Sequence, residues 1–364
     1  MHQASPKKRD AFLQKMTSIL NGGALNLAMA LGYRTGLFDA MDGFSSPRSP
    51  AAIANQAGLS ERYVREWLGV MVTGGIVELA RENGEALYFL PPEHGDFVAR
   101  RAGDSNLAVY AQEMPLLTTC AMEPVLEGFR TGDGVPYDRY KGFQAFMTEL
   151  SNAKHRKVLV DRFLPSVDEG RLAERLKEGI RVCDFGCGEG VAAILMAQAF
   201  PRSRFTGIDL CEETLAKGRE EASSKKLENA RFEARDAARL TEDASLRGTY
   251  DYILAFDAIH DQTAPLEALR SVRHLLAPGG LFSMVDIAAG SEHRDNLDHP
   301  MGPFLYAVSL LHCMPVGLVN GGAGLGMMWG REKALEMLKE AGFHRVEVLE
   351  MEHDPFNVHY LCRA

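Results

Sequence analysis

Short apolar runs alternate with helical patterns through the second half of the chain, and this alternation limits the folds open to it. Five such runs lie at 180–185, 204–209, 230–235, 250–256 and 281–287. Nearly continuous apolar strands separated by helices are typical of a parallel sheet that helices cover on both faces. The pattern therefore predicts a doubly wound α/β domain.

The end of the chain departs from this alternation. A predicted helix at 331–341 is followed by two short strands, 346–350 and 357–362, with no helix between them. A dinucleotide-binding sheet carries a helix in every crossover, so a closing antiparallel hairpin argues against that class. With the five earlier runs, the hairpin predicts a seven-stranded sheet.

A glycine-rich turn follows the first predicted strand. Gly186, Gly188 and Gly190 are spaced G-x-G-x-G, and Asp184 lies two residues before the first of them. Glycines allow a tight turn and close approach of a ligand. A carboxylate at this place can accept from the amino group of an amino-acid ligand and would repel a pyrophosphate. The alternative is a plain turn with Asp184 as a local cap.

Two more acids follow the next two strands. Asp209 ends the strand at 204–209, lies 19 residues after Gly190 (209 − 190), and could bind both ribose hydroxyls. Asp236 follows the third strand and could accept from an adenine amine. Either residue could instead cap the following segment. All three acids fall at carboxyl ends of strands, where doubly wound folds bind ligands.

Together these residues resemble the class I methyltransferases that use S-adenosylmethionine (SAM), and the resemblance covers roughly residues 161–364. It implies SAM as the cofactor, with the methionine part on the glycine-rich turn, the ribose on Asp209 and the adenine on Asp236. The cofactor contacts that it implies are Asp184, Gly186, Cys187, Gly188, Asp209, Leu210, Asp236, Ala237 and Asp257.

A His-Asp pair, His260-Asp261, follows the fourth strand. It is similar to the pair of plant and bacterial small-molecule O-methyltransferases, which implies that His260 is the general base and that Asp286 orients it. A histidine suits this role because it can be neutral and accept a proton near pH 7. The family's Trp after the pair is Gln262 here. The alternative is a His260 that caps or packs at the strand end.

The first hundred residues predict a winged helix. Helices are expected at 10–32, 50–57 and 60–73, followed by strands at 76–79 and 86–90 around a Glu-Asn-Gly turn. From Ser46 to Arg100 five Arg stand against seven acids, a net charge of −2, which disfavours DNA. The same O-methyltransferases use this domain to form homodimers, so a homodimer is expected. The chain also resembles bacterial winged-helix methyltransferases that have been labelled transcriptional regulators.

Three domains are therefore expected. Residues 1–105 would form a winged-helix dimerisation domain, 106–165 a helical linker that walls the pocket, and 166–364 the SAM-binding domain. An insert at 288–330, rich in glycine and apolar residues, is interpreted as a lid over an uncharged or aromatic acceptor.

Composition bears on where the protein is found and on which partners it can bind. Six scattered cysteines and the polar start at 1–10 predict a cytoplasmic protein without signal peptide or membrane span, and the net charge of −9 disfavours nucleic acid. No spacing of His, Cys or acids predicts a metal. The expected function is methyl transfer from SAM to a small molecule, at a hydroxyl. The alternatives are N-methylation of a small amine, or a SAM-sensing DNA-binding regulator.

Overall fold

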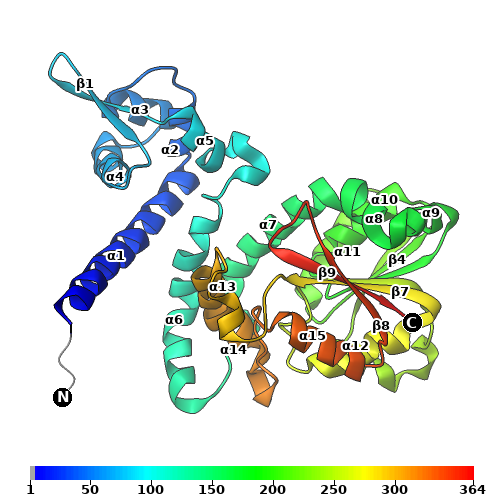
Figure 1. Cartoon of the computed structure of the whole chain (residues 1–364). Helices are drawn as coiled ribbons and strands as arrows, with labels where there is room; N and C mark the ends of the chain where they lie inside the picture. Colours follow the sequence, from blue (N-terminus) through cyan, green and yellow to red (C-terminus); the bar gives the residue numbers. More distant parts are fainter. Residues whose placement is uncertain (1–4) are drawn as a thin grey trace. The chain divides into compact units, whose positions relative to one another are not determined.

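The computed structural model describes residues 5–364, so residues 1–4 of the polar first segment lie outside it. The chain forms two compact units, residues 1–116 and 117–364. Figure 1 colours them from blue to red along the sequence. The predicted boundaries at 105 and 165 stay predictions.

The first unit has the predicted winged helix. Its elements are α1 (Pro6–Thr35), α2 (Leu37–Asp42), α3 (Pro50–Ala57), α4 (Glu61–Thr73), β1 (Glu78–Glu82), β2 (Glu85–Phe89) and α5 (Pro92–Val98). The apolar stripe of α4 faces the core, where Val64, Trp67, Leu68 and Met71 are buried. The indole of Trp67 donates to the carbonyl of Ala28 over 2.8 Å, which fastens α4 to α1. The antiparallel pair β1–β2 forms the wing.

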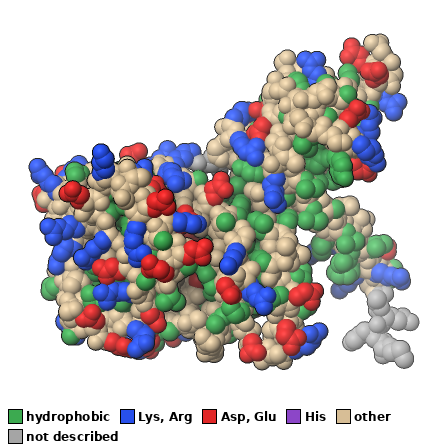
Figure 2. All heavy atoms as spheres, turned by 180° about the vertical axis from the view of Figure 1, so that it is seen from behind, with side chains coloured by type: hydrophobic (Ala, Val, Ile, Leu, Met, Phe, Trp, Pro, Cys, Tyr) green, Lys and Arg blue, Asp and Glu red, His purple; other side chains and the backbone are tan. Residues whose placement is uncertain are grey.

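Helix α1 buries little of its own apolar surface. Seven of its large apolar side chains are between 38% and 69% exposed: Phe12, Leu13, Met16, Ile19, Leu20, Leu27 and Leu31. Most of them recur every three or four residues, so they lie on one side of the helix. Figure 2 shows green apolar side chains gathered at the surface of this unit. We call these seven residues the α1 stripe.

The second unit is built on a seven-stranded sheet. Its strands are β3 (Arg181–Phe185), β4 (Arg204–Asp209), β5 (Ala230–Ala234), β6 (Tyr250–Phe256), β7 (Leu276–Ile287), β8 (Arg345–Glu350) and β9 (Asn357–Arg363). The order is β5-β4-β3-β6-β7-β9-β8, and only β9 runs against its neighbours. The predicted fold class, including the closing hairpin, is confirmed.

Helices cover both faces of this sheet (Figure 1). On one face α9 (Arg171–Glu178), α10 (Val191–Ala199) and α11 (Glu212–Ser224) bury apolar residues against β3 and β4. On the other, α12 (Pro265–Leu275) and α15 (Gly330–Glu340) pack on β6 and β7. Each strand thus needs apolar residues on both sides, which is why the strands read as continuous apolar runs.

One local prediction is wrong. The strand expected at 281–287 is longer than predicted, because β7 already begins at Leu276. Tyr250 pairs with Leu276 and Tyr252 with Leu281, so the extra residues form a bulge inside the strand. Gly279, at φ +73°, supplies the left-handed conformation that such a bulge requires.

Two helical segments complete the unit beside the carboxyl end of the sheet. Helices α6 (Glu113–Thr131) and α7 (Lys141–Val158) come before the sheet in sequence, followed by the short α8 (Leu164–Ser166). Between β7 and α15 lie α13 (Gly302–Val308), a π-helical turn at Ser309–Cys313, and α14 (Met314–Gly317). The lid role of residues 288–330 stays a prediction.

Candidate active site

A cavity of about 270 Å³ lies where β3, β6 and β7 end. Helix α7 and the insert before α15 supply the rest of its wall. Six of the sequence-predicted site residues line it: Asp184, Gly186, Cys187, Gly188, Asp257 and His260. The structure thus brings the first predicted strand end and the predicted base to one cavity.

The glycine-rich turn shapes one side of this cavity. Gly188 has φ +54°, and a Cβ built there would meet nothing within 4 Å, so its backbone faces open space. Gly190 has φ +73°, and a Cβ there would lie 2.1 Å from the ring of Phe232. Gly190 is therefore required by packing, whereas Gly188 leaves room for a ligand to approach the backbone.

Asp184 is a buried carboxyl at the end of β3. Its Oδ2 accepts from the backbone N–H of Ala193 over 3.1 Å, and no Lys or Arg among residues 5–364 forms an ion pair with it. Burial raises its pKa to about 7, although the bond from Ala193 opposes this. A buried carboxyl without a cation suits a ligand that brings an ammonium group, as the methionine part of SAM does.

Asp209 is held rigidly at the end of β4. Its Oδ2 accepts from the N–H of Gly188 and its Oδ1 from the N–H of Cys211, each over 2.9 Å. The first bond ties the carboxylate directly to the glycine-rich turn. Each carboxylate oxygen has a second lone pair free for a hydroxyl donor, so the residue fits a ribose diol.

Asp236 caps the segment that follows it, which is the alternative role that the sequence left open. Its Oδ1 accepts from the N–H of Ala238 over 2.9 Å and caps a short 3₁₀ helix that begins at Ala237. Leu210 is 75% exposed. Neither these residues nor Asp209 belongs to the wall of the 270 Å³ cavity. Their predicted contacts with adenosine stay predictions.

His260 and Asp286 form a buried pair at the other end of the cavity. The Nδ1 of His260 lies 2.7 Å from the Oδ1 of Asp286, which also accepts from the N–H of Ile287 over 2.8 Å. With the proton on Nδ1, this bond leaves Nε2 free to act as an acceptor. Asp286 lies behind the histidine and does not line the cavity.

The surroundings favour the protonated form of His260. Burial alone lowers its pKa, but the charges of Asp286 and Asp261, together with hydrogen bonds, outweigh burial and hold the pKa well above its usual value. The Oδ1 of Asp261 lies 3.4 Å from Nε2. Nε2 must therefore lose its proton before it can accept one from a hydroxyl, so base catalysis by His260 requires the deprotonated imidazole.

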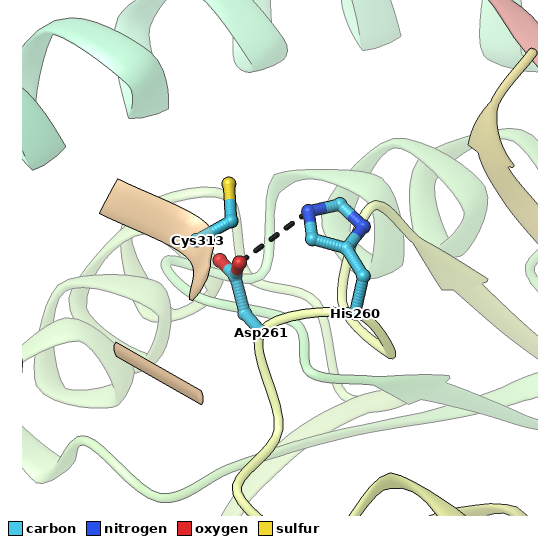
Figure 3. Close-up of side chains that lie close together, drawn as sticks. All are labelled: His260, Asp261 and Cys313. Atoms are coloured by element: carbon cyan, nitrogen blue, oxygen red, sulfur yellow. Dashed lines mark ion pairs between the residues drawn. The ribbon is translucent and has the colours of Figure 1, made fainter. Parts of the chain in front are cut away.

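Sequence reasoning missed several side chains at this cavity. Glu189 binds Lys217 over 2.7 Å and accepts from Asn152 of α7 over 3.4 Å, which links the glycine-rich turn to the cavity wall. Asp261 and Cys313 lie beside His260 (Figure 3). Asp261 was named in the His-Asp pair but was given no role, and nothing in the spacing of Cys313 points to the site.

Two stretches of the chain match described families. Residues 176–348 match the methyltransferase domain family, and residues 23–100 match the Rv2258c-like winged HTH domain family. Among curated proteins, a demethylmenaquinone methyltransferase of Staphylococcus aureus strain JH9 is 27% identical over 185 residues, which cover 48% of this chain and 71% of that protein.

Solved structures share the fold over nearly the whole chain. The mitomycin 7-O-methyltransferase MmcR has a TM-score of 0.68 and 18% identity, covering 99% of this chain and 100% of its own. Human N-acetylserotonin methyltransferase in complex with SAM has a TM-score of 0.63 and 15% identity, covering 100% and 99%.

The chain therefore carries a methyltransferase domain behind an N-terminal winged HTH domain. The matched domain and the curated relative identify it as a methyltransferase. Among the helices of residues 5–364, none combines the length and apolar character that a membrane crossing requires.

Proposed function

We propose that this enzyme transfers the methyl group of SAM to a hydroxyl of a small molecule, with His260 as the general base. The observation behind this proposal is the 2.7 Å contact between the Nδ1 of His260 and Asp286, which leaves Nε2 turned toward Asp261, another residue of the cavity wall. In this arrangement Asp286 fixes the ring orientation and its tautomer, as the acid of a catalytic triad does.

The chain's own residues have three tasks in this reaction. When bound, SAM supplies an electrophilic methyl group on a sulfonium. Asp184 would hold the cofactor's ammonium group, Asp209 its ribose and Asp236 its adenine. His260 would take the proton of the acceptor hydroxyl on Nε2 as the new O–C bond forms and the S–C bond breaks. Most of the acceleration would come from alignment of the two reactants.

The cavity wall supports an uncharged, largely apolar acceptor. Phe143 and Met147 of α7 line it together with Val308 and Met327 of the insert. His312 also lines it, and its ring packs 4.8 Å from Phe143 and 4.7 Å from Tyr140, centroid to centroid. Burial lowers the pKa of His312, which favours its neutral form. An aromatic alcohol would find apolar contacts here, whereas the four carboxyl side chains of the wall, Asp184, Glu189, Asp257 and Asp261, would repel an anionic acceptor.

A homodimer through the first unit is part of the proposal. The α1 stripe exposes seven large apolar side chains on one helix, and a second copy of the same helix could cover them by a twofold contact. A DNA-binding regulator has less support. Arg62 and Arg65 of α4 pair with Glu66 and Glu61, each at 2.5 Å, which reduces their availability to phosphates. A cytoplasmic location stays a prediction.

The function is tested by incubating the full-length protein with methyl-labelled SAM and a pool of phenols, aliphatic alcohols and amines. We expect label in a phenol product, with the rate lowered by roughly 10²-fold or more in His260→Ala. His344→Ala, an exposed histidine outside the cavity, is the matched control and should behave as the wild type. Label on an amine that survives His260→Ala would replace this proposal with N-methylation.

A further inference from the structure

Three side chains with different donor atoms meet at the floor of the cavity (Figure 3). His260 and Asp261 lie in the loop after β6, and Cys313 ends the π-helical turn of the insert. One imidazole nitrogen, one carboxylate oxygen and one thiol sulfur lie within 4.8 Å of one another. His260 and Cys313 are buried, and Asp261 is partly exposed. His260 and Cys313 are 53 residues apart in sequence (313 − 260), so their spacing along the chain does not predict that they meet.

Hydrogen bonding within the chain leaves this group incompletely satisfied. The Oδ1 of Asp261 is shielded from solvent and has no hydrogen-bond partner among the described residues. The Nε2 of His260 lies 3.4 Å from it and forms an ion pair with it only while the imidazole is protonated. A buried polar atom without a partner is costly and calls for an explanation, such as an ion at the site.

His260 is also oriented as a metal ligand would be. Ligating histidines nearly always donate their second ring N–H to a carboxylate, which fixes the ring and raises its basicity. Here that second contact is the 2.7 Å bond from Nδ1 to Asp286. Nε2 is then the nitrogen that points toward Asp261 and Cys313.

The donor set distinguishes between metal ions. Mg²⁺ and Ca²⁺ require shells of oxygen atoms, whereas Zn²⁺ accepts nitrogen, oxygen and thiolate ligands in a tetrahedron. Ligand atoms around tetrahedral Zn²⁺ are separated by roughly 3.3–3.6 Å, given bonds of about 2.0–2.3 Å. The contact between His260 and Asp261 already has this length, and small side-chain shifts would bring in the sulfur.

We propose that His260, Asp261 and Cys313 form a Zn²⁺ site whose fourth position opens into the acceptor cavity. Binding releases two protons to solvent, the thiol proton of Cys313 and the Nε2 proton of the protonated His260, and the metal takes their places. The metal also takes the Nε2 lone pair. If the proposed function holds, so that His260 is the base, Zn²⁺ therefore stops methyl transfer. Binding itself does not depend on that role.

The experiment titrates metal-free, full-length protein with Zn²⁺ in competition with a chromophoric chelator. We expect one Zn²⁺ per chain, with an affinity at least about tenfold weaker in Cys313→Ser. Cys120→Ser, which changes a partly buried thiol of α6 outside the site, is the matched control and should bind as the wild type. Asp261→Asn should weaken binding as well, should Cys313→Ser fail to fold.

A second readout reports the sulfur ligand directly. Co²⁺ in the same site should give a sulfur-to-cobalt charge-transfer band in the near ultraviolet, and Cys313→Ser should remove it. No stoichiometric binding by the wild type, or equal affinity in Cys313→Ser, would overturn the site.

Activity measured in the same titration separates the site from the proposed function. Methyl transfer that needs His260 in a protein that binds no Zn²⁺ would overturn the site and leave the function standing. Stoichiometric Zn²⁺ binding that leaves the transfer rate unchanged would support the site and remove His260 as the base.

Discussion

In the proposed mechanism Asp286 would act through another residue, because it touches His260 and does not line the cavity. We expect Asp286→Asn to lower kcat by roughly 10²–10⁴-fold, since an amide can stabilise the wrong tautomer of the imidazole. SAM affinity should stay unchanged. Calorimetric titration with SAM, beside steady-state rates, checks this separation, and an equal loss in affinity and kcat would indicate structural damage instead.

If Asp184 binds the ammonium group of SAM as proposed, SAM binding should depend on pH with a defined sign. Burial raises its pKa to about 7, so below that pH the free enzyme carries a neutral carboxyl. The ammonium group of SAM prefers the carboxylate, so affinity should fall as pH drops below about 7, by up to about tenfold per pH unit. Between pH 7 and 8 it should level off.

Dissociation constants measured from pH 5.5 to 8 test this. In Asp184→Asn the slope should vanish and affinity at pH 8 should fall. A slope that persists in the variant would assign the titration to another group.

Several residues could be placed from the sequence because strand ends and motif positions coincide. Asp184 and Asp209 lie at the ends of predicted strands and His260 lies shortly after one, and β4 and β6 have the predicted bounds. Cys313 could not be placed, since it reaches the site only through packing of a long insert. For Asp236 the position was predicted but the role was not. The same spacing fits a ligand contact or a helix cap, and its hydrogen bond from Ala238 forms the cap.

At the scale of elements, the turn from β3 to α10 combines two glycines with different tasks. Gly190→Ala meets both a left-handed φ and a Cβ 2.1 Å from Phe232, so it should lower the free energy of unfolding by roughly 3–5 kcal/mol. Gly188→Ala meets open space, so it should cost only about 1–2 kcal/mol from its φ. It should nevertheless weaken SAM binding, because the added methyl group occupies the ligand's approach.

Urea denaturation and SAM titration of both variants form the test. If both variants lost the same stability, the conclusion that Gly190 is required by packing and Gly188 by ligand access would be wrong.

The elements themselves were largely predictable, because hydrophobic periodicity sets them. The bulge in β7 was not, since Pro278-Gly279-Gly280 is a turn signal whose outcome depends on the partner strand. Tertiary pairing with β6 continues the strand across the signal. The local sequence therefore predicts that the backbone bends at this point, but whether the strand also ends there depends on its pairing with the neighbouring strand.

For the whole molecule, the proposed homodimer makes the α1 stripe its test. If a second copy covers it, a charge in its middle must be buried without a partner, which is costly. We expect Leu20→Glu to raise the dimer dissociation constant by at least about 100-fold, measured by sedimentation velocity or by light scattering. Leu297→Glu, which changes an 80% exposed leucine of the insert, should leave the dimer intact and is the matched control. A wild-type protein that stays monomeric at all concentrations would mean that the stripe is covered by something other than a second copy.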